Sequence, residues 1–162
     1  MALLQPGDAF PDLTINQRDG ATASLHETLA GSYGVVLFYR GSFCPYCRTQ
    51  LRAFQRSQEN LRAHNIKVVA LSVDDEETTQ ALIDKLRLDF PVGHSADAHA
   101  IADGIGAFVN PDPVYLQSTG FVLDPESKVI VGVWSNGAIG RLVPEDVIGL
   151  VEYAQSHQET AA

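Results

Sequence analysis

The sequence of 162 residues is short of three things: cysteine, basic residues and long apolar runs. A membrane-spanning helix needs about 20 consecutive apolar residues, and no run approaches that length, so we expect no contact with the membrane interior. The N-terminus lacks the basic and apolar regions of a secretory signal, which favours a cytoplasmic protein. With 11 basic against 20 acidic residues, the net charge of −9 argues against nucleic acid or an anionic membrane as the main partner.

A chain of this length needs no disulfide for stability, because folding buries roughly 70% of the surface that the unfolded chain exposes. Two cysteines in a cytoplasmic protein therefore indicate catalysis or metal binding rather than a structural bridge. Apolar residues make up 45% of the sequence and charged residues 19%, as in an ordinary globular protein. We expect one domain over residues 1–162, in which the polar residues 156–162 form a frayed tail.

Apolar runs bounded by turn residues alternate with stretches of helical periodicity. The runs predict strands at residues 35–39, 67–73, 90–92, 120–124 and 128–134. The periodic stretches predict helices that begin near residues 45, 75, 96 and 144. A short strand or hairpin and a helical turn precede them, and residues 110–113 are expected to form a loop. This order predicts an α/β fold, a three-layer α/β/α sandwich with a mixed central sheet.

Both cysteines lie in the run Cys44-Pro45-Tyr46-Cys47, directly after the predicted strand 35–39. We expect Cys44 to cap a helix that begins at Pro45, which places Cys47 in its first turn. The free N–H groups and the dipole of a helix start favour the thiolate, the form that attacks disulfides and peroxides. The sequence therefore predicts a redox-active pair. Cys44, expected nearer the surface, attacks while Cys47 resolves, or the two roles are reversed.

Five of the eleven basic residues gather around this pair, at Arg40, Arg48, Arg52, Arg56 and Arg62. Arg40 is the candidate for a functional cation, because it immediately precedes the loop that carries the thiols. Arg48, Arg52 and Arg56 are spaced by four residues and form one basic stripe, which either supports the site or is a solvated helix face.

Metal binding is an alternative use of the two thiols. A zinc site would need two further ligands, which His94 and His99 could supply. No second cysteine pair exists, so we expect neither a metal nor a cofactor. His94, His99 and Asp103 are expected on the surface of a helix.

Several segments, taken in order, resemble the alkyl hydroperoxide reductase/thiol-specific antioxidant (AhpC/TSA) family, the peroxiredoxin-like branch of the thioredoxin fold. They are residues 7–13, 25–29, 35–47, 70–74, 90–92 and 120–124. The resemblance covers about residues 5–155. It implies a thioredoxin-like sandwich and an antioxidant enzyme that reduces hydroperoxides through a dithiol–disulfide cycle. It also implies an external dithiol reductant of the thioredoxin or glutathione type and, commonly, a homodimer.

The chain departs from the peroxiredoxin motif Pro-x-x-x-Thr/Ser-x-x-Cys, whose last cysteine attacks peroxide. Aligning Cys47 with that cysteine puts Arg40 at the proline and Cys44 at the threonine. The same residues resemble the C-P-Y-C of thioredoxins and glutaredoxins, in which Cys44 would attack and Pro45 and Tyr46 would support it. That reading implies a protein-disulfide reductase with little peroxidase activity.

The cis-proline that thioredoxins place beside the active site is also missing, because Ser118-Thr119 stands there. Arg141 is a candidate for the arginine that peroxiredoxins often have near the thiol. Without a third cysteine, a sulfenic acid on either thiol can be resolved within the monomer only by its neighbour. A third hypothesis is a binding module in which the disulfide acts as a redox switch.

Overall fold

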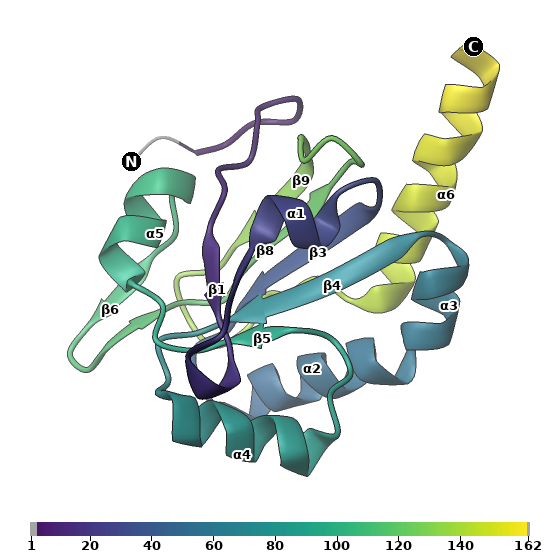
Figure 1. The fold of residues 1–162 in the computed structure, drawn as a ribbon. Coiled ribbons are helices and arrows are strands. Elements are labelled where there is room, and N and C mark those ends of the chain that lie inside the picture. Colours follow the sequence, from purple (N-terminus) through teal and green to yellow (C-terminus); the bar gives the residue numbers. More distant parts are fainter. Residues whose placement is uncertain (1–2, 162) are drawn as a thin grey trace.

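The computed structural model describes residues 3–161, with side chains for residues 3–157. Its centre is a five-stranded sheet in the order β5-β4-β3-β8-β9 (Figure 1). The strands are β3 (Tyr33–Phe38), β4 (Ile66–Leu71), β5 (Val92–Gly93), β8 (Thr119–Leu123) and β9 (Val129–Trp134). β3 pairs in parallel with β4 and antiparallel with β8, so the sheet is mixed, as predicted.

Helices cover both faces of this sheet (Figure 1). One face packs against α2 (Pro45–Arg56), α3 (Gln58–Ala63), α4 (Glu76–Leu86) and α6 (Pro144–Ala161). The other packs against α1 (Leu25–Leu29) and α5 (Ala98–Ile105). Because side chains alternate along a strand, Val35 and Leu37 of β3 enter the first core while Val36 and Phe38 enter the second. The predicted α/β/α sandwich is confirmed.

Two small hairpins lie outside the central sheet. β1 (Thr14–Asn16) pairs with β2 (Thr22–Ser24) across a short 3-10 turn, as predicted. β6 (Val109–Pro111) pairs with β7 (Val114–Leu116). The loop predicted over residues 110–113 is confirmed at residues 112–113, which form the turn, and is wrong at residues 110–111, which belong to β6. Pro111 and Pro113 argue against a central strand, but this hairpin is a separate two-stranded sheet in which Pro111 ends its strand.

The helix ends follow local signals. α5 stops at Ile105, because Gly106 adopts a left-handed conformation with φ of 82°. Ser57 separates α2, which ends at Arg56, from α3, which begins at Gln58. α6 continues to Ala161, through most of the expected tail, and residue 162 lies outside the described residues, so fraying stays a prediction. In the part of the chain that the structure describes, no helix has the length and apolarity to cross a membrane.

Strand pairing brings four distant segments to one edge of the central sheet. Phe38, at the end of β3, is paired with Leu71 at the end of β4 and with Thr119 at the start of β8. Thr119 is in turn paired with Trp134 at the end of β9. The residues that follow β3, β4 and β9 and those that precede β8 must therefore lie close together, and both cysteines are among them.

Candidate active site

The thiols lie at the first turn of α2. Cys44 is the N-cap, and its Sγ accepts a hydrogen bond from the backbone N–H of Cys47 at 3.4 Å. Pro45 is the first helical residue, where its missing N–H costs no hydrogen bond. No acidic residue stands in this first turn to offset the positive end of the helix dipole. The predicted capping arrangement is confirmed, and both cysteines are free thiols.

The loop between β3 and α2 is held from two sides. The N–H of Ser42 donates to Asp74 Oδ2 at 2.8 Å, and the carbonyl of Ser42 accepts from Arg48 Nη1 at 2.6 Å. Arg48 therefore orders the loop, whereas Arg52 and Arg56 of the basic stripe are exposed to solvent. Asp74 is half-buried, and this burial raises the pKa of its carboxyl group. Hydrogen bonds from the N–H and the side chain of Ser42 lower that pKa but offset only part of the rise.

Two arginines contact the sulfurs. Arg40 donates from Nη1 to Cys44 Sγ at 3.5 Å and from its backbone N–H to Cys47 Sγ at 3.3 Å. Arg141 Nη2 lies 2.9 Å from Cys47 Sγ and 3.7 Å from Cys44 Sγ. Arg40 thus lies where its position before the loop predicted, and Arg141 reaches the thiols from the segment between β9 and α6.

These contacts separate the pKa values of the two thiols. Burial by itself would raise the pKa of Cys44, but hydrogen bonds from the Cys47 thiol and N–H and from Arg40, together with the charge of Arg141, lower it below its ordinary value. Burial raises the pKa of Cys47, and its hydrogen bond to Cys44 adds to this, so that Arg40 and Arg141 offset only part of the rise. Cys44 is therefore the thiol that ionises first.

Both cysteines are covered from solvent, although Cys44 was expected nearer the surface. The exposed fraction is 0% for Cys44 and 1% for Cys47. Cys44 is covered because its side chain folds back over the helix start and is contacted by the half-buried Arg40 and Arg141. Pro45 and Tyr46, between the two cysteines, are exposed instead. A substrate must displace part of this cover to reach a sulfur.

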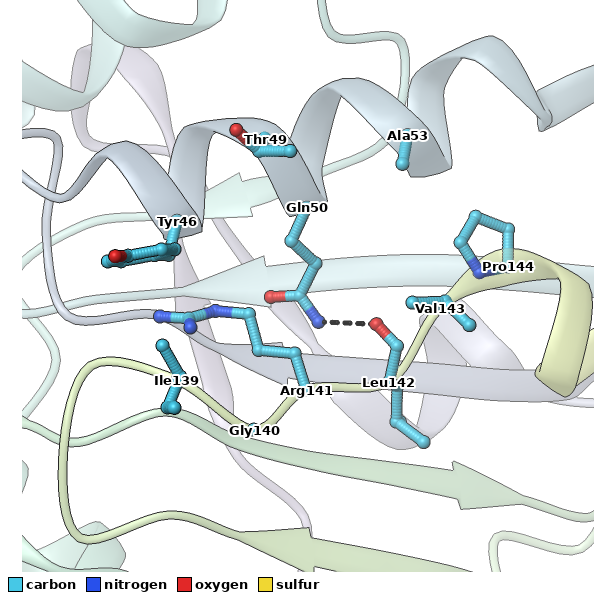
Figure 2. Close-up of a pocket in the computed structure, with 10 residues that line it drawn as sticks. All are labelled: Tyr46, Thr49, Gln50, Ala53, Ile139, Gly140, Arg141, Leu142, Val143 and Pro144. Atoms are coloured by element: carbon cyan, nitrogen blue, oxygen red, sulfur yellow. Dashed lines mark hydrogen bonds between the residues drawn. The ribbon is translucent and has the colours of Figure 1, made fainter.

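A largely apolar pocket of about 290 Å³ opens beside the thiols, between α2 and the segment that leads into α6 (Figure 2). Gln50 on α2 donates to the Leu142 carbonyl at 3.0 Å and ties the two walls together. Figure 2 shows the guanidinium group of Arg141 pointing along the pocket toward Tyr46. Because Arg141 also contacts both sulfurs, the pocket and the thiols share one residue.

Two residues of the site have no signal in the sequence. Tyr115 on β7 and Gln117, which follows it, each accept a hydrogen bond from the side chain of Arg40. They lie more than 70 residues from Arg40 in the sequence, shortly after the predicted loop at residues 110–113. Only the pairing that ends at Thr119 places them opposite the loop with the thiols.

The other candidates do not join the site. His99 and Asp103 lie on α5, as expected, but His94 follows β5 outside any helix, where its ring bonds to Ser95 and to the Gln17 carbonyl. Among the described residues, no three histidine, cysteine or acidic side chains gather in a group that could hold a metal ion. The two thiols therefore have no further ligand from His94 or His99 in this structure.

The sequence is similar to those of known proteins. The sequence model of the AhpC/TSA family matches residues 6–131. A peroxiredoxin of Methanothermobacter thermautotrophicus is 28% identical over 147 residues, covering 87% of this chain and 69% of that protein. Alkyl hydroperoxide reductase C of Mycolicibacterium smegmatis is 26% identical over 176 residues, covering 98% of this chain and 88% of that protein.

Solved structures agree at the level of the fold. AhpC of Mycobacterium tuberculosis superposes with a TM-score of 0.79 at 20% identity, covering 96% of each chain. AhpC of Enterococcus faecalis superposes with a TM-score of 0.81 at 19% identity, covering 99% of this chain and 98% of the other. At these identities the likeness shows a shared fold.

Proposed function

The chain belongs to the AhpC/TSA family and is a thiol-dependent peroxidase, and we propose that its catalytic groups are Cys44 and Cys47. The observation that carries this proposal is the dithiol at the start of α2, with Arg40 and Arg141 both within hydrogen-bonding reach of sulfur. Cations and helix N–H groups stabilise the thiolate that attacks peroxide.

In the first step, the Cys44 thiolate attacks one oxygen of a hydroperoxide. An S–O bond forms and the O–O bond breaks, which leaves a sulfenic acid on Cys44, while the departing alkoxide or hydroxide takes a proton from water. Cys44 is assigned to this step because its pKa is the lowered one of the pair. Arg40 and Arg141 stabilise the negative charge on the reacting atoms.

In the second step, the Cys47 sulfur attacks the sulfenic sulfur, so that an S–S bond forms and water leaves. The peroxide has then been reduced by two electrons and the dithiol oxidised. An external dithiol, of the thioredoxin or glutathione type, returns the disulfide to the dithiol by exchange and is itself oxidised. This cycle fits the reducing cytoplasm.

The cysteine variants test the assignment. With Cys44 as nucleophile, Cys47→Ser accumulates a sulfenic acid that dimedone traps, and Cys44→Ser does not react with peroxide. The family motif aligns its attacking cysteine with Cys47, and Arg141 lies 2.9 Å from that sulfur. The opposite result, sulfenic acid in Cys44→Ser only, would move the nucleophile to Cys47. Sulfenate formation no faster than that of free cysteine would remove the peroxidase proposal.

The pocket beside the thiols supports organic hydroperoxides as substrates, because its apolar walls suit the carbon chain of such a molecule. Ala53→Phe places a ring in this pocket without touching a sulfur. We expect it to slow the reaction with cumene hydroperoxide and to leave that with hydrogen peroxide unchanged. Ala63→Phe, at the exposed end of α3, is the matched control. Equal slowing of both peroxides would contradict a role for the pocket.

Protein-disulfide reduction is the second candidate function. The exposed aromatic rings of Phe43 and Tyr46, beside the thiols, favour it because they offer a contact surface to another protein. Reduction of insulin disulfides at a rate comparable to that of thioredoxin, with slow peroxide reduction, would support it.

A homodimer remains part of the proposal, and sedimentation velocity measures it directly.

A further inference from the structure

Every side-chain nitrogen of Arg40 has its own partner. Nε donates to Gln117 Oε1 at 3.0 Å, and Nη2 donates to the hydroxyl of Tyr115 at 2.9 Å. Nη1 is left to point at Cys44 Sγ, at 3.5 Å. The guanidinium group is planar, so fixing two of its nitrogens also fixes the direction of the third.

Two aromatic rings add to this restraint. The central carbon of the guanidinium group lies 5.1 Å from the centre of the Tyr115 ring and 5.6 Å from that of Phe43. The two rings meet edge to face, with centres 5.2 Å apart. Cation–π contacts at these distances are attractive, and they confine a side chain that would otherwise occupy many rotamers.

Given the proposed role of Cys44 as the nucleophile, we propose that Tyr115 and Gln117 are positioning residues that hold Nη1 of Arg40 against the Cys44 sulfur. Tyr115 and Gln117 both bond to Arg40, and both act on the sulfur through it. The interaction between a cation and a thiolate weakens with distance. An Arg40 free to turn towards solvent would therefore stabilise the thiolate less, and the β6–β7 hairpin that carries Tyr115 prevents this.

The remaining groups around Cys44 limit the size of the effect. Arg141 reaches the sulfur from the segment before α6, and Cys47 faces it from α2. Asp74, which follows β4, accepts a hydrogen bond from the N–H of Ser42 in the loop. Because Arg141 and the helix start stay in place, loss of one Arg40 restraint weakens the stabilisation of the thiolate without abolishing it.

The test is the pH titration of the Cys44 thiolate, followed by the rate of alkylation with iodoacetamide and by absorbance at the thiolate band. In Tyr115→Phe and in Gln117→Ala we expect the midpoint to rise by about half a pH unit, the effect of one hydrogen bond. The peroxide rate at neutral pH should fall about threefold and should recover as the pH rises. Tyr153→Phe, an exposed tyrosine on α6, is the matched control and should leave the midpoint in place.

A double-mutant cycle separates positioning through Arg40 from a general structural role. In the background of Arg40→Met, Tyr115→Phe should move the midpoint no further. An unchanged midpoint in both single variants, or an equal shift in the Arg40→Met background, would overturn the proposal. Alkylation needs no peroxide, so a failure of the peroxidase proposal would appear only in the peroxide rate of the parent protein and can be told apart.

Discussion

Arg40 stands where the family motif has proline, and it makes two contacts that proline cannot make. Its backbone N–H donates to Cys47 Sγ and its side chain donates to Cys44 Sγ. Proline has neither an N–H nor a charge. Arg40 therefore supplies both sulfurs with a donor, while the second cysteine, Cys44, stands four residues later at the threonine of the motif.

The two thiols are expected to titrate separately. A thiolate forms as the pH rises through the pKa of its group, and the pKa of Cys44 is lowered while that of Cys47 is raised. Cys44 should therefore be alkylated at a pH at which Cys47 is still protonated. Fragment-ion mass spectrometry of protein treated with iodoacetamide across a pH series distinguishes the two positions. Earlier labelling of Cys47 would contradict the assignment of Cys44 as nucleophile.

Arg141 is expected to matter to both thiols, because it contacts both sulfurs. In Arg141→Met, the pKa of each thiol should rise, and the peroxide rate at neutral pH should fall by about tenfold, as a charge-assisted hydrogen bond is worth about 1.5 kcal/mol or more. Stopped-flow kinetics measure the rate. Arg52→Met removes an exposed arginine from the basic stripe and should change neither quantity. A similar loss of peroxide rate in Arg52→Met would show that the basic stripe contributes to the site.

The loop between β3 and α2 is the element on which the site depends, and Gly41 allows its shape. Gly41 has φ of 155°, a backbone conformation that other residues rarely adopt. A Cβ atom there would lie 2.5 Å from the Phe43 ring and 3.1 Å from Asp74 Oδ1. Both neighbours are part of the site, because Phe43 packs on Arg40 and Asp74 holds Ser42.

Gly41→Ala is therefore expected to lower the free energy of unfolding by about 1–3 kcal/mol and to slow the peroxide reaction, since strain of this size follows from an unfavourable backbone angle. Chemical denaturation and stopped-flow kinetics measure the two effects. Gly104→Ala is the control, because a Cβ atom at that position of α5 meets no atom within 4 Å. It should stabilise the protein by about 0.5–1 kcal/mol and leave the rate unchanged. Equal behaviour of the two variants would show that the loop tolerates a side chain.

At the scale of the whole molecule, the sheet separates two cores. The thiols belong to the core under α2 and α6, while Phe121 belongs to the core on the opposite face. Phe121 is fully buried and meets the rings of Phe10 and Trp134 edge to face, with centres 4.9 Å and 5.4 Å away. Stability and thiol chemistry should therefore respond separately to changes in the second core.

Phe121→Ala is expected to reduce the free energy of unfolding by about 3–5 kcal/mol, the usual effect of removing a buried ring. The midpoint of the Cys44 titration in the remaining folded protein should stay where it is. Phe108→Ala, at a ring that is 40% exposed, should cost less than about 1 kcal/mol. A moved thiol midpoint in Phe121→Ala would show that the two faces are coupled through the sheet.

The sequence by itself determined the features that depend on residues close together in the chain. The cap at Cys44, the helix start at Pro45, the strand before it and the order of most elements follow from local preferences and hydrophobic periodicity. The resemblance to the AhpC/TSA family rests on the same ordered segments and is confirmed. Arg40 could be chosen as a candidate because it lies only four residues before Cys44.

Tertiary structure alone decided which distant residues complete the site. Tyr115 and Gln117 reach Arg40, and Arg141, until then a candidate by family resemblance only, reaches both sulfurs. They do so because β3 pairs antiparallel with β8 and β8 with β9, which brings the ends of those strands to one edge. The tertiary structure also decided the burial of Cys44, since Arg141, one of the two arginines that cover it, lies far from it in the sequence. Pairing between strands far apart in the chain has no local signature, whereas a helix cap is complete within four residues.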